Sequence, residues 1–191
     1  ERKIKMTFHQ DIRLNQTIFK QMINKSFIKY KCDPFVFTNS VTGIVGLYIG
    51  DKIFQLKNEQ KEFHYFNSVD DISLWQITES KASDIQSAFI DINQIETPIE
   101  QIIKKITLVN EQQIAFINEQ CYSLWITRAI IFHLENRDIY FEKDNTAFSE
   151  EIIIKRGHNL LEEFPKRNDY FLDEWNSNVV PEVKTEFITI E

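Results

Sequence analysis

The chain has 191 residues, a formal net charge of −7, 42% hydrophobic residues and 27% charged residues. This balance is typical of a globular protein and excludes a disordered chain. No apolar run approaches the roughly 18 residues that a membrane span needs, and ERKIKMTFHQ (1–10) lacks the apolar core of a secretory signal. We therefore expect a soluble, cytoplasmic protein that does not associate with membranes.

Charge is distributed unevenly along the chain. Residues 1–31 hold eight Lys and Arg against two Asp and Glu, whereas both the middle of the chain and residues 142–191 are acidic. A nucleic-acid binder needs clustered cations, so an acidic body makes nucleic acid an unfavoured partner. The basic N-terminal segment keeps that hypothesis open, and it predicts binding that weakens with salt.

The first half of the chain predicts a short helix followed by several strands. TIFKQMINKSFI (17–28) has the spacing of a helical turn that leads into a strand. The strands 44–49 and 53–56 flank Gly50-Asp51-Lys52, which predicts a hairpin because glycine tolerates a positive φ. A strand is expected over 72–77, and the polar stretch TESKASDIQSAF (78–89) predicts a loop with one helical turn.

The second half of the chain predicts a similar series of secondary-structure elements. Thr97-Pro98-Ile99-Glu100 has the residues of a helix start, and β-branched residues follow at 106–109, so we expect a helical turn that leads into a strand. The segments 130–134 and 139–141 predict a second hairpin. The remaining expectations are a strand at 152–155, two short helical pieces within 159–175 broken at Pro165, and an edge strand at 181–191.

These two series suggest an internal duplication. TIFKQMINKSFI (17–28) matches TPIEQIIKKITL (97–108), with Thr, Gln, Ile and Lys at equivalent positions. Three further blocks follow in the same order: 31–38 over 120–127, 43–54 over 129–140, and 69–75 over 149–155. We therefore expect a mainly β fold with minor helix, in which two pseudo-repeated units of about four strands pack together. The units span 1–80 and 90–158, and a helical and strand extension spans 159–191, all within one compact domain.

Each unit resembles a pattern of small, uncharacterised, internally duplicated β-rich bacterial proteins. That pattern has an opening of the I-G-K-x-I-x-x-V kind, a hairpin, and an acidic pair that leads a strand, here Asp70-Asp71 and Glu150-Glu151. The resemblance covers about 17–75 and 97–158, although Phe19-Lys20 and Ile99-Glu100 carry no glycine. It implies a β-rich bacterial protein and no particular activity.

The residues that carry chemistry form no recognised catalytic or metal-binding motif. Cys32 and Cys121 predict free thiols, with a disulfide between the two units as the alternative. The four histidines fit no metal-ligand spacing, so we expect structural histidines, no metal and no cofactor. Adjacent carboxylates on a strand point to opposite faces, so the acidic pairs predict no acid and base couple.

Two functional hypotheses follow. The first is a non-enzymatic, acidic protein-interaction module, in one version an immunity- or antitoxin-like protein, that binds a basic protein. Its binding residues are expected in NDYFLDEWN (168–176), where aromatic anchors alternate with acids: Asp169, Tyr170, Phe171, Asp173, Glu174 and Trp175. The alternative for these aromatics is a C-terminal segment that docks on the core.

The second hypothesis is a small-molecule-binding protein or hydrolase with its site in the groove between the two units. The residues expected to supply such a site are His133, His158, Arg128 and Glu151.

Overall fold

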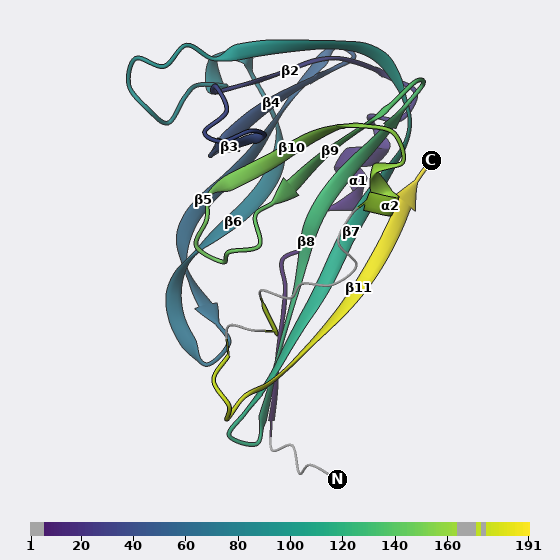
Figure 1. Cartoon of the computed structure of the whole chain (residues 1–191). Coiled ribbons are helices and arrows are strands. Elements are labelled where there is room, and N and C mark those ends of the chain that lie inside the picture. Colours follow the sequence, from purple (N-terminus) through teal and green to yellow (C-terminus); the bar gives the residue numbers. More distant parts are fainter. Residues whose placement is uncertain (1–5, 164–170, 173–174) are drawn as a thin grey trace.

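The computed structural model describes residues 6–163, 171–172 and 175–191. In this part of the chain nearly all regular structure is β, in one mainly antiparallel sheet of 11 strands, with two short α-helices and one 3-10 turn, η1 (Figure 1). The mainly β fold expected from the sequence is therefore confirmed. The elements are β1 (Met6–Asp11), α1 (Gln16–Lys20), β2 (Ser26–Cys32), β3 (Ser40–Thr42), β4 (Ile44–Ile49), β5 (Lys52–Tyr65), β6 (Ser68–Ser80), η1 (Ala82–Asp84), β7 (Ile95–Ile117), β8 (Gln120–Leu134), β9 (Asp138–Lys143), β10 (Glu151–Gly157), α2 (Leu160–Glu163) and β11 (Val180–Ile190).

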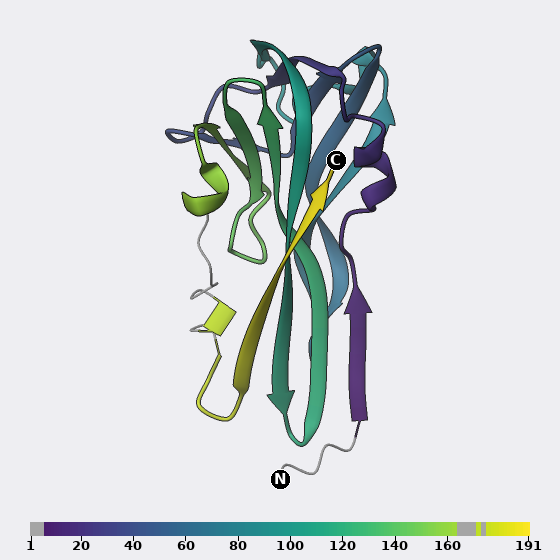
Figure 2. The same ribbon diagram turned by 90° about the vertical axis from the view of Figure 1, so that its right-hand side faces the viewer.

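The long strand β7 organises the sheet, whose order is β3-β10-β9-β8-β7-β2-β4-β5-β6. One edge of β7 pairs with β2 near its start and with β11 over the rest of its length, and its other edge pairs with β8. The edge of β8 that points away from β7 is also divided. Strand β1 pairs in parallel with its first part, and β9 pairs with its last part. Strand β11 pairs antiparallel with β7 and is drawn in yellow in front of it in Figure 2.

The main core lies where the sheet bends back on itself. Strand β2 faces strands β8 and β9 across this core: the Phe27 and Phe132 rings are 5.2 Å apart, and the Tyr30 and Phe141 rings are 5.9 Å apart. Both pairs meet edge to face, which is a favourable aromatic geometry. Residues from both halves of the sequence therefore share one core.

Several sequence-based predictions are confirmed. The strands β4 and β5 form the expected hairpin at Gly50-Asp51, and β8 and β9 form the second one. The predicted strands 72–77 and 152–155 lie within β6 and β10, the polar linker contains η1, and β11 is the late edge strand. Both cysteines are free thiols. The first helical piece of 159–175 is α2, and most of the second lies outside the described residues.

The predicted helical turn at Thr97-Pro98-Ile99-Glu100 is wrong, because these residues belong to β7. This stretch pairs with β2 on one edge, while β8 first reaches β7 at Ile103. A proline is tolerated there because its missing N–H lies on the unpaired edge. Two residues of β7, Ile99 and Glu100, lie opposite Ile28, and Glu100 has a φ of 54°, which is the geometry of a β-bulge.

The internal duplication is not confirmed. Residues 43–54 and 129–140 both form hairpins, and 69–75 and 149–155 both contain strands. However, 17–28 forms α1 and the start of β2 while 97–108 is continuous strand.

No helix among the described residues is long and apolar enough to cross a membrane.

Candidate functional site

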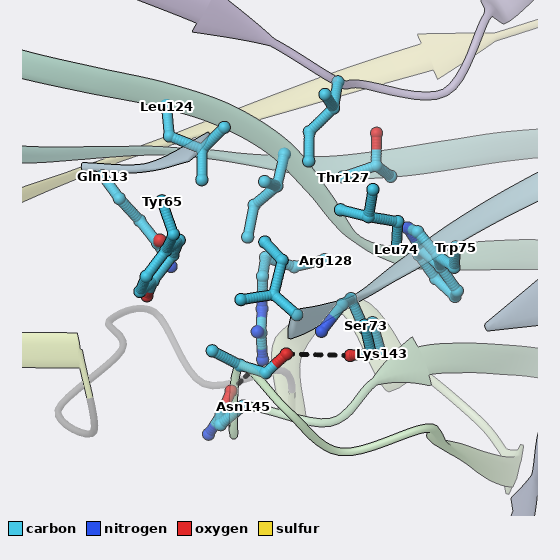
Figure 3. Close-up of a pocket in the computed structure, with 14 residues that line it drawn as sticks. Tyr65, Ser73, Leu74, Trp75, Gln113, Leu124, Thr127, Arg128, Lys143 and Asn145 are labelled. Atoms are coloured by element: carbon cyan, nitrogen blue, oxygen red, sulfur yellow. Dashed lines mark hydrogen bonds between the residues drawn. The ribbon is translucent and has the colours of Figure 1, made fainter. Parts of the chain in front are cut away.

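A small cavity lies beside β8, where its edge passes from β1 to β9. Pairing with β1 ends at Trp125, and pairing with β9 begins at Ala129. The cavity has a volume of about 50 Å³, and its lining comes from β5 to β9, the β9–β10 link and the residue that follows β1. In Figure 3, Tyr65 and Gln113 lie to one side, Leu74 and Trp75 to the other, and Lys143 and Asn145 below.

Arg128 reaches this cavity because it is an extra residue in β8. Thr127 pairs with Asn110 and Ala129 pairs with Val109, which leaves Arg128 without an opposite residue on β7. A bulge of this kind re-aims a side chain. The guanidinium group is buried, lies 3.7 Å from a carboxylate oxygen of Glu142, and donates to the side-chain oxygen of Asn145.

The carboxylate next to Arg128 is itself buried. Removal from water raises the pKa of Glu142, although Arg128 and a 2.9 Å hydrogen bond from the Tyr140 hydroxyl oppose the change. Glu111 is also buried and accepts a 2.8 Å hydrogen bond from the Gln113 amide. A buried charge is costly unless it is paired, so these polar residues form an interdependent group.

Lys143 is the unusual residue of the cavity. It is 7% exposed, and burial together with the charge of Arg128 lowers its pKa to about 7, while Asp144 opposes this change. No described residue forms a hydrogen bond or ion pair with its ammonium group. Trp75 also lines the cavity, and its buried indole nitrogen lacks a hydrogen-bond partner among the described residues.

A second candidate site is a pair of apolar loops at one end of the molecule. We call residues 33–39, between β2 and β3, and residues 85–95, which lead into β7, the apolar loop pair. Figure 1 shows the second loop projecting at the upper left. Half of the fourteen exposed large hydrophobic residues among those described lie in this pair: Phe35, Val36, Phe37, Phe89, Ile90, Ile92 and Ile95.

The two loops are held side by side by sheet pairing and by one buried carboxylate. The first loop leaves β2 after Cys32, whose pairing partner Ile95 begins β7. The carboxylate of Asp33 accepts hydrogen bonds from the Ser87 hydroxyl at 2.7 Å and from the Gln94 amide at 3.1 Å. The apolar side chains are therefore presented together by a fixed base.

The structure places only part of the predicted binding segment 168–176. Phe171 is 1% exposed and packs against Phe66, and the Trp175 ring lies 5.1 Å from the Phe66 ring. These two aromatics belong to a second apolar cluster, as in the alternative of a core-docking segment. The predicted binding residues Asp169, Tyr170, Asp173 and Glu174 lie outside the described residues.

Of the four residues expected in a groove site, only Arg128 lines the cavity. His133 lies five residues further along β8, roughly 16 Å at the usual strand rise, and is held by the Thr107 hydroxyl at 2.8 Å and Asp138 at 3.0 Å. His158 is exposed, and Glu151, the first residue of β10, pairs with Thr42 of β3. Among the described residues no cluster of His, Cys, Asp and Glu could hold a metal ion.

Lys143 and Trp75 are not among the site residues expected from the sequence. Alternation along β9 places Lys143 on the same face as Ile139 and Phe141, both fully buried. A lysine that continues an apolar face is a usable signal for a buried cation. The apolar loop pair was missed because its two parts are distant in the sequence.

Comparison of the chain with models of known protein families, with curated proteins and with solved structures finds no match.

Proposed function

We propose that this chain is a non-enzymatic protein-interaction module that binds a partner protein through the apolar loop pair. The observation that carries the proposal is the concentration of exposed large hydrophobic side chains on two adjacent loops. Exposed apolar patches on proteins commonly mark interaction sites, and seven exposed large hydrophobic residues lie on these two loops. Phe37 is 68% exposed and Ile90 is 90% exposed, so a partner would bury much of both side chains.

The negative charge of the chain favours a partner protein with basic groups over a lipid surface as the partner of the apolar loop pair. The chain has a net charge of −7, and the second loop contains the exposed carboxylate of Asp91. Cytoplasmic membrane surfaces are negatively charged and attract basic segments. The expected partner therefore offers an apolar pocket with a basic rim, which also fits an immunity- or antitoxin-like protein that covers a basic enzyme.

The test compares two double variants in pull-downs from the source organism, followed by titration of the purified partner. Phe37→Ser with Ile90→Ser removes the two most exposed side chains of the loop pair. The matched control is Phe187→Ser with Val180→Ser, which changes exposed apolar residues of β11. We expect the wild type and the control to bind one basic partner in near-equal amount, and the loop variant to bind it at least about tenfold more weakly.

Equal binding of the partner by the loop variant would contradict this proposal. So would loss of self-association in the loop variant, measured by light scattering, because a second copy would then be the occupant. Binding to vesicles of anionic lipid that disappears in the loop variant would instead assign the loops to a membrane.

A further inference from the structure

The cavity beside β8 has more hydrogen-bond donors than the protein satisfies. Lys143 and Trp75 both line it, and neither the Lys143 ammonium group nor the Trp75 indole N–H donates to any group in the described part of the chain. Trp75 is 6% exposed and Lys143 is 7% exposed. Buried donors are nearly always satisfied, and one that is not loses the free energy of its bonds to water. The Lys143 ammonium group therefore lines a cavity in which the protein itself provides no acceptor for it.

The charges around the cavity also favour an anion. The titratable groups that act on Lys143 are Arg128 from β8, which lowers its pKa, and Asp144 from the β9–β10 link, which raises it. The carboxylate closest to Arg128 belongs to Glu142, whose pKa is raised by burial. No carboxylate of the described residues lies within 4 Å of the Lys143 ammonium group.

The volume and walls of the cavity restrict the ligand. A volume of about 50 Å³ has room for about four water molecules, and hence for an organic molecule of about four to six non-hydrogen atoms. Much of the lining is aliphatic: Ile12, Ile72, Leu74, Leu124, Ile126 and Ala147. A ligand that fits both the donors and these walls has an anionic end and a short hydrocarbon part.

We propose that this cavity binds a small aliphatic monocarboxylate, whose carboxylate pairs with Lys143 and whose hydrocarbon part contacts Leu74 and Ile126. This site lies apart from the apolar loop pair, so it stands or fails independently of the protein-interaction proposal.

Binding of this kind depends on pH in a defined direction. The pKa of Lys143 is about 7 in the free protein, and a bound carboxylate raises it because an opposite charge favours the protonated form. Above pH 7, ligand binding is therefore accompanied by the uptake of one proton from solvent by Lys143. Affinity should be constant between about pH 5 and pH 7 and should fall by up to about tenfold per pH unit above that range.

The experiment is calorimetric titration of the full chain with sodium propionate at pH 6.5 and pH 8.5, with propionamide as the uncharged isostere. We expect propionate to bind with a Kd of about 1 mM or tighter, and propionamide to bind at least tenfold more weakly. Lys143→Met should lose propionate binding by at least about tenfold, whereas Lys184→Met, an exposed lysine on β11, should keep it.

Three results would overturn the proposal. Propionamide binding as tightly as propionate would show an apolar cavity without anion recognition. Unchanged propionate binding by Lys143→Met would place the anion elsewhere. No heat and no rise in Tm with acetate, propionate or butyrate at about 100 mM, a hundred times the expected Kd, would show that the cavity holds water only. The comparison of propionate with propionamide uses the wild-type chain and so does not depend on the folding of a variant.

Discussion

At the scale of single residues, Lys143 is a side chain that costs free energy to bury in its charged form. Its pKa is lowered to about 7, first by burial and then by Arg128. The unfolded chain keeps an ordinary lysine pKa near 10.4. Between these two values the unfolded state binds more protons than the folded state, so the free energy of unfolding rises with pH across that window. The penalty is therefore full below about pH 7 and absent above about pH 10.5.

Replacement of Lys143 by methionine should stabilise the protein at low pH. Methionine has a similar length and no charge, and replacing buried charges by apolar groups can add about 1–4 kcal/mol to the free energy of unfolding. Urea unfolding at pH 6 should show a gain in this range for Lys143→Met, and the gain should shrink towards zero at pH 10. Lys184→Met is the matched control, with little change at either pH. An equal gain at both pH values would mean that the stabilisation has another cause.

Single residues also show where sequence analysis succeeds and fails. His133 is held by two side chains, as expected of a structural histidine. Arg128 is among the candidates expected from the sequence. The sequence does not show why it reaches the cavity, because its position depends on a bulge defined by the pairing of its neighbours with Asn110 and Val109. Trp75 belongs to the main core. Its unpaired N–H depends on neighbours from distant strands, which no local pattern reveals.

At the scale of elements, η1 is fastened to β4 by a close contact. A Cβ added at Gly46 would lie 2.6 Å from a methyl carbon of Ile85, the buried residue that follows η1. The absence of a side chain at Gly46 therefore lets Ile85 sit directly on the strand. This contact anchors the base of the second loop of the apolar loop pair.

Gly46→Ala should disturb this anchor. We expect a loss of about 1–3 kcal/mol in the free energy of unfolding, the usual cost of overpacking. In an Ile85→Ala background most of this penalty should disappear, because the methyl groups that the new Cβ meets are gone. Urea unfolding of the two single variants and the double variant forms the required cycle. Strictly additive losses would show that the Gly46 backbone, and not its contact with Ile85, sets the cost.

The strands were predictable where local signals and tertiary pairing agree. Gly50 has a φ of 59° at the β4–β5 turn, and this hairpin follows from residues 44–56 alone. The segment 97–100 was predicted as a helical turn because Thr97 and Pro98 match a helix start. Pairing with β2 outweighs that signal, and the β-branched isoleucines of the segment suit a strand. The bulge at Glu100 could not be predicted, since it depends on Ile28.

At the scale of the whole molecule, β7 joins what the sequence presents as two units. Its first part pairs with β2, which belongs to residues 1–80, and its later part pairs with β8, within 90–158. The main core contains residues of both ranges, including Phe27 and Phe132 in direct ring contact. A sheet with a shared strand and a shared core has no internal boundary at which one half could unfold alone.

We therefore expect one cooperative unfolding transition. Trp75 in β6 and Trp125 in β8 can report on the two halves separately in variants that keep only one tryptophan. Urea midpoints from the two fluorescence signals and from far-UV circular dichroism should coincide. Leu108→Ala, at a fully buried position of β7, should lower all three midpoints together, with a loss of about 2–5 kcal/mol. Phe187→Ala, at an exposed position of β11, should change them little. Separate midpoints for Trp75 and Trp125, or a Leu108→Ala shift confined to one of them, would instead indicate two units that fold independently, as the apparent sequence repeat suggests.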